Sequence, residues 1–100
     1  MSRVVVADLS TLRARIDALD DQLLRLLNER AALAREIGAA KREQGLPLHA
    51  PARERDIVMR LAGRNTGPFP TDGVRPVFQE IFRACLLVEG ARFTAEGKDP

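Results

Sequence analysis

A small set of charged residues in this sequence has the chemistry to bind an anion. Arginine pairs with a carboxylate through two parallel hydrogen bonds, which fixes the orientation of the bound group as well as neutralising its charge. The candidates are four cations and two carboxyl groups predicted to point inward beside them: Arg13, Arg30, Lys41, Arg53, Glu54 and Glu89. We interpret this set as a pocket for a small dianion.

The sequence lacks the residues for several other kinds of chemistry. One cysteine, Cys85, and one histidine, His49, are too few for a disulfide framework or a typical zinc site within one chain. No activated nucleophile and no glycine-rich phosphate loop is apparent. We therefore expect neither a metal nor a cofactor, and we interpret Cys85 as a small core residue and His49 as a loop residue.

Arg30 interrupts a regular apolar pattern. Apolar residues recur at alternating three- and four-residue spacings at Leu9, Leu12, Ile16, Leu19, Leu23, Leu26, Leu33 and Ile37. Arg30 takes the one missing position, and neither Gly nor Pro occurs before Ile37. The spacing predicts one long helix with a coiled-coil-like seam. Because a guanidinium does not lose its proton, Arg30 must be solvated, paired with an acid, or bound to an anion.

The long helix is predicted to begin near Asp8 or Ser10 and to end at about Gln44, ahead of Gly45. Its length of roughly 50 Å exceeds what a compact chain with a radius of gyration of about 13 Å could cover, so the seam is predicted to pack on a second copy.

Lys41 follows Arg30 at a wheel angle of about 20° and a distance of roughly 16 Å, which leaves room for a small ligand. Arg13 is about 25 Å from Arg30 and would instead complete the site of an antiparallel partner.

Two shorter helices follow. The first is predicted from Pro51 to about Arg64, with Glu54 on the same face as its apolar residues, and the second from Thr71 or Asp72 to about Glu89. The inner stripe of the second consists of Phe78, Ile81, Phe82 and Cys85, and Glu89 takes the next position. We predict an all-α fold of three helices in one domain over residues 9–90, with tails at 1–8 and 91–100.

Bulk composition excludes other classes. The chain has 100 residues, 45% of them hydrophobic, and a net charge of only +2, which is too small to indicate a nucleic-acid binder. No apolar run approaches the roughly 20 residues that span a bilayer. We expect a cytoplasmic protein that binds neither nucleic acid nor membrane.

Between about Leu9 and Glu89 the sequence contains a characteristic series of motifs, namely Leu12-Arg13, Ile16-Asp17, Asp20, Leu23-Leu24, Leu27, Glu29-Arg30, Leu33-Ala34, Ile37-Gly38, Lys41 and Arg53-Glu54-Arg55. With this series the sequence resembles the all-helical class of chorismate mutase. It implies an intertwined homodimer of three-helix chains with two equivalent sites. It also implies the rearrangement of chorismate to prephenate in phenylalanine and tyrosine biosynthesis, without a cofactor.

The same resemblance implies roles for the charged residues. Arg13 from the other chain and Arg30 would hold the two carboxylates of chorismate, and Lys41 would reach the ether oxygen and a carboxylate. Arg53 would support carboxylate binding, while Glu54 would accept a hydrogen bond from the ring hydroxyl.

Three positions near the implied ligand are variable or atypical. Cys85 falls where the family often has a small polar residue, and Ala50 where members often carry Asp. Glu89 falls where many members have Gln facing the ether oxygen. Because Glu donates a hydrogen bond only when protonated, we expect kcat/KM to fall as pH rises and Glu89→Gln to flatten that profile.

Two other functions remain open at this point. An isochorismate pyruvate lyase would share the fold and the cationic pocket but eliminate pyruvate. A weakly active helical dimer could instead regulate a partner enzyme of the shikimate pathway. A purely structural coiled coil is less favoured, since it gives no role to Arg30, Lys41, Glu54 and Glu89 together.

Overall fold

The computed structural model describes residues 8–90, which form three α-helices and one short 3-10 turn and contain no strand. The elements are α1 (Leu9–Gln44), α2 (Pro51–Arg64), the turn η1 (Thr71–Gly73) and α3 (Val74–Glu89). The predicted all-α fold of one long and two shorter helices is confirmed. The tails predicted at 1–8 and 91–100 lie outside the described residues, apart from Asp8.

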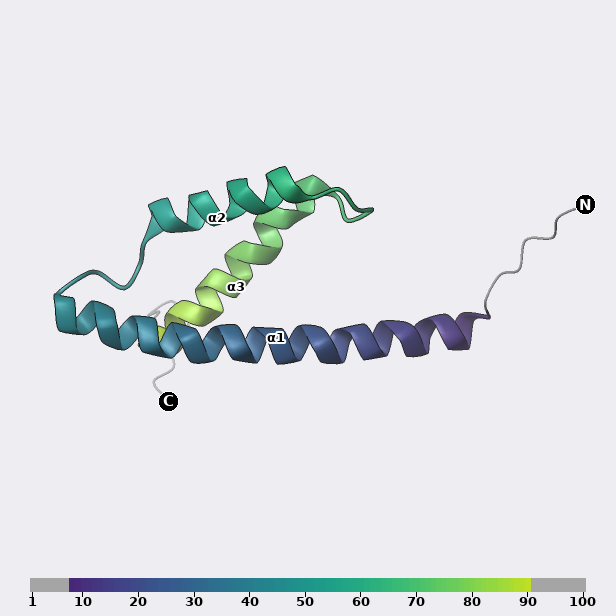
Figure 1. The fold of residues 1–100 in the computed structure, drawn as a ribbon, viewed down its shortest axis with the longest axis horizontal. Coiled ribbons are helices and arrows are strands. Elements are labelled where there is room, and N and C mark those ends of the chain that lie inside the picture. The colour runs from purple at the N-terminus through teal and green to yellow at the C-terminus, as the bar shows by residue number, and fades with distance from the viewer. Residues whose placement is uncertain (1–7, 91–100) are drawn as a thin grey trace, which may run out of the picture.

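Helix α1 is a rod that extends well beyond the other two helices (Figure 1). Its 36 residues correspond to about 54 Å. The Asp8 side chain caps its first turn by accepting a hydrogen bond from the Thr11 backbone N–H. At the other end Gly45 adopts a φ of 71° and its N–H bonds back to the last turn, which ends the helix where glycine was expected to end it.

Helix α3 crosses obliquely between α1 and α2, and its C-terminal end meets the second half of α1 (Figure 1). The core lies where α3 packs on α2 and consists of Ile57, Val58 and Phe82, with Leu61 and Phe78 partly buried against them. These residues are the predicted inner faces of the two shorter helices. The arrangement brings the C-terminal part of α1, the first half of α2 and the C-terminal half of α3 into one region.

The start of α3 differs in detail from the sequence prediction. Residues Thr71–Gly73 form a 3-10 turn, and the α-helix itself begins at Val74. Pro76 is thus the third residue of the helix, inside the first turn, where its missing N–H has no partner to lose.

The apolar seam of α1 is left largely uncovered by the other helices of residues 8–90. Every residue from 8 to 29 is exposed, and Leu23, in the middle of the seam, is 57% exposed. A helix with an apolar stripe normally buries that stripe against another element. Within residues 8–90 this stripe has no such packing partner. None of the helices in residues 8–90 is long and apolar enough to cross a membrane.

Candidate active site

A cavity of about 540 Å³ opens where the three helices converge. Its lining consists of Arg30, Leu33, Ala34, Ile37, Lys41, Leu48, Ala50, Arg53, Glu54, Ile57, Phe82, Cys85, Leu86 and Glu89. Six of the seven side chains proposed from the sequence line this one cavity. Arg13 does not, since it lies on the exposed first half of α1.

Arg30 is held over the inner face of α3. Its Cζ atom lies 5.5 Å from the ring centroid of Phe82, and its Nη1 donates to Cys85 Sγ over 3.1 Å. An aromatic face attracts a cation without neutralising its charge. No carboxylate within residues 8–90 forms an ion pair with Arg30, so the guanidinium charge remains available to a ligand in the cavity.

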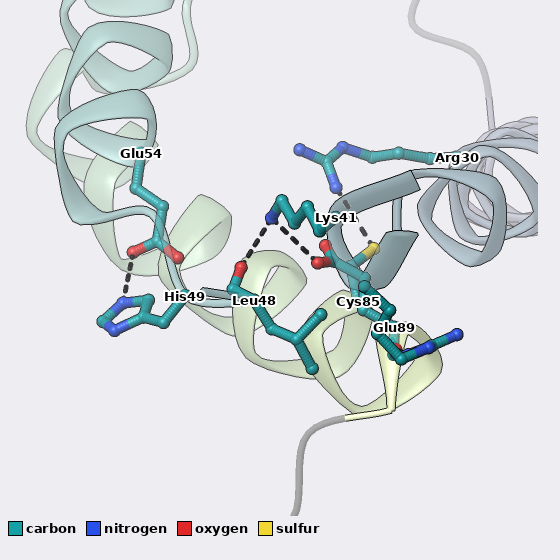
Figure 2. A network of polar contacts seen from close by, with 8 residues as sticks. Arg30, Lys41, Leu48, His49, Glu54, Cys85 and Glu89 are labelled. Carbon is teal, nitrogen blue, oxygen red and sulfur yellow. Dashed lines mark hydrogen bonds and ion pairs between the residues drawn. The ribbon is translucent and has the colours of Figure 1, made fainter. Parts of the chain in front are cut away.

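The Lys41 side chain, on α1, contacts α3 and the loop that follows α1. Its Nζ lies 2.9 Å from Glu89 Oε1 and also donates to the backbone carbonyl of Leu48 (Figure 2). The side chains of Lys41 and Glu89 are only 19% and 10% exposed. The carboxyl group of Glu89 is therefore already turned into the cavity and engaged by a cation.

The N-terminal turn of α2 supplies the opposite side. Glu54 Oε1 lies 3.5 Å from His49 Nε2, and the exposed Arg53 beside Glu54 also lines the cavity. Figure 2 shows Glu54 across the network from Arg30 and Lys41. Ala50 precedes the helix without a side-chain cap, as its residue type predicts.

Three features of the site were not foreseen from the sequence. The Phe82 ring beneath Arg30 was foreseen only as a core residue, and the Leu48 carbonyl bonded to Lys41 belongs to a connecting loop. The third is the hydrogen bond from Arg42 Nη1 to the backbone carbonyl of Glu89. No group of three or more candidate metal ligands occurs in the described part of the chain.

Comparison with known proteins identifies the family to which this chain belongs. The chorismate mutase type II family model matches residues 12–90. A bifunctional chorismate mutase/prephenate dehydratase of Aquifex aeolicus is 43% identical over 86 residues, which cover 82% of this chain and 24% of that protein. The chain thus spans about a quarter of the length of this curated relative.

Solved structures are similar over most of their length. A chorismate mutase of Thermus thermophilus aligns with a TM-score of 0.79 and 41% identity, over 83% of this chain and 94% of that one. A chorismate mutase of Helicobacter pylori in complex with prephenate aligns with a TM-score of 0.74 and 33% identity, over 81% and 88% of the two chains. The chain therefore belongs to the chorismate mutase type II family.

Proposed function

We propose that this chain catalyses the rearrangement of chorismate to prephenate. The observation that carries the proposal is the convergence of Arg30, Lys41, Arg53, Glu54 and Glu89 on a single cavity, in a chain of this family. The reaction breaks one C–O bond and forms one C–C bond within the substrate. It needs no nucleophile, cofactor or obligatory proton transfer, which agrees with the residue types that line the cavity.

The site must do two things for this reaction. It must hold the compact conformer in which the two reacting carbons meet, and it must stabilise negative charge that grows on the ether oxygen. Arg30 binds one carboxylate, supported by Arg53, and Lys41 donates to the ether oxygen and a carboxylate. Glu54 accepts a hydrogen bond from the ring hydroxyl, and Glu89 faces the ether oxygen. Cys85 lies beside the ligand and orients Arg30.

The charges and the exposed seam together support a second copy of the chain. Three cations and two carboxyl groups line the cavity, and Arg13 of the partner subunit would add a fourth cation for a substrate with two negative charges. The exposed seam on the same half of α1 as Arg13 provides the surface for an antiparallel partner, so we propose an intertwined homodimer with Arg13 contributed in trans.

Lys41 and Glu89 are in contact, and both are assigned to the ether oxygen of the substrate. Lys41 and Glu89 are both proposed to donate toward the ether oxygen, yet an ionised Glu89 only accepts. A glutamine at this position would donate a hydrogen bond at every pH, so Glu89→Gln tests whether Glu89 acts as a donor to the ether oxygen.

A partner domain or enzyme is a further proposal. The Aquifex aeolicus relative is named as bifunctional and carries a prephenate dehydratase activity in its name. The product of the proposed reaction is the substrate of that activity. We propose that this chain works beside another shikimate-pathway enzyme, and that mutase turnover rises when that enzyme is added if the chain is the weakly active, regulated kind.

One assay tests the proposed function. Purified protein is incubated separately with chorismate and with isochorismate, and prephenate and pyruvate are both quantified. We expect prephenate from chorismate and no pyruvate from isochorismate. Pyruvate release from isochorismate would assign the lyase function, and no turnover of either substrate, with or without a partner enzyme, would remove the catalytic proposal.

A further inference from the structure

The C-terminal end of α3 is fixed to α1 by contacts to its main chain. Glu89 is the last residue of α3, and its backbone carbonyl accepts a hydrogen bond from Arg42 Nη1. The last four carbonyls of a helix have no partner within the helix, so ends of this kind open easily. Arg42 supplies the missing partner from a different helix.

Two glycines make this contact possible. A Cβ atom on Gly38 would lie 2.6 Å from the Glu89 carbonyl oxygen and 2.8 Å from the Glu89 Cα, so only glycine lets the two backbones approach this closely. A Cβ atom on Gly90, which adopts a φ of +111°, would lie 2.8 Å from Arg42 Nη1. Both glycines therefore clear the space around the Arg42–Glu89 bond.

The same stretch of α1 also holds the side chain of Glu89. Gly38 and Arg42 are four residues apart and share one face of the helix. Lys41, next to Arg42, places its Nζ 2.9 Å from Glu89 Oε1. Adjacent residues of α1 thus hold the main chain and the carboxyl group of Glu89 separately, and only Lys41 and Glu89 of these residues line the cavity.

We infer that Arg42 is a positioning residue that fixes the end of α3 and so the place of the Glu89 carboxyl group in the site. The inference rests on the proposed mutase function for its kinetic consequence, but not for the contact itself. Without Arg42 the last turn of α3 frays and Glu89 loses its fixed distance to the reacting atoms. A misplacement of about 1 Å costs up to about 10²-fold in rate, so Arg42→Ala is expected to lower kcat by about 10- to 100-fold.

The test is a double-mutant cycle on chorismate turnover. Arg42→Ala is measured in the native protein and in a Glu89→Ala background, with the exposed Arg35→Ala as the matched control on the same helix. A residue that acts through Glu89 has an effect in the native protein and less than about a twofold effect once that side chain is gone. Arg42→Lys keeps a cationic donor and is expected to recover most of the rate.

Amide hydrogen exchange over residues 86–90 tests the contact between Arg42 and the Glu89 carbonyl without using activity. We expect faster exchange at this end of α3 in Arg42→Ala and unchanged exchange in Arg35→Ala. A native rate and native exchange in Arg42→Ala, or equal rate losses in both backgrounds, would overturn the inference. If the native protein does not turn over chorismate, the proposed function fails while the exchange result still decides whether Arg42 holds α3.

Discussion

The strongest consequence of a shared site is that two inactive variants should restore each other's activity. In the proposed homodimer, Arg13→Ala and Arg30→Ala each remove one of the two arginines of a site, and the two arginines come from opposite subunits. A mixed dimer of the two variants has one site with both arginines intact and one site with neither. In a dimer with independent sites in cis, every site would lack one arginine.

The size of the effect follows from counting sites. Each mixed dimer has one intact site of two, so purified mixed dimers are expected to have about one half of wild-type activity, and a random mixture, in which about half of the dimers are mixed, about one quarter. Each variant alone is expected at about 1% or less, because losing a preorganised charged donor costs about 10²- to 10³-fold. The mixture should therefore exceed either variant by more than about 20-fold.

The assay is prephenate formation after co-expression of the two variants with different affinity tags, so that mixed dimers are purified through both tags. Dimer mass and helical circular dichroism confirm that each preparation is folded. Doubly tagged dimers with no more activity than the single variants would refute the placement of Arg13 in trans.

Three further predictions concern Glu89, the helix contact at Gly38 and the cap at Asp8. Glu89→Gln should flatten the fall of kcat/KM with rising pH; a profile unchanged by the substitution would show that Glu89 is not the donor. Gly38→Ala should lower the free energy of unfolding by up to about 2 kcal/mol in urea titrations, because overpacking costs about 1–3 kcal/mol and the gain in helix propensity returns only about 1 kcal/mol. Gly63→Ala, which meets no atom within 4 Å, should be neutral or stabilising, and a gain in stability at Gly38 instead would contradict the contact. The Thr11 backbone N–H bonded to Asp8 holds the pKa of Asp8 below its ordinary value of 3.8, so the cap is fully present above that pH and is lost as pH falls through the lowered pKa. Amide exchange in the first turn of α1 should accelerate on acidification, Asp8→Asn should remove that dependence, and equal acceleration in both proteins would exclude the cap as its cause.

The helices could be predicted from the sequence because several of their ends carry residue types that are strongly preferred at helix ends. Gly45 and Gly90 take positive φ values at two helix ends, and Pro51 begins α2. The start of α3 was less predictable, because a 3-10 turn and the first turn of an α-helix favour similar residues. Local chemistry thus sets most of the boundaries to within a residue or two.

The candidate site was predictable where a charge stands in an apolar position. Arg30 breaks the seam of α1 and Glu89 ends the inner stripe of α3, and both line the cavity. The hydrogen bond from Arg42 to the Glu89 carbonyl could not be predicted from residue types in this way, because any residue at position 89 has a backbone carbonyl. From the sequence alone, Gly38 is only a residue with low helix propensity. The close approach of α3 explains why a glycine stands there.

The assignment of Arg30 as half of a carboxylate clamp is tested most directly by kcat/KM for chorismate in the native protein and in Arg30→Ala. Arg35→Ala, an exposed arginine five residues along the same helix, is the matched control. We expect a loss of at least about 100-fold in Arg30→Ala, with native helical content and dimer mass, and no loss in the control. Full activity in Arg30→Ala would contradict the proposed site.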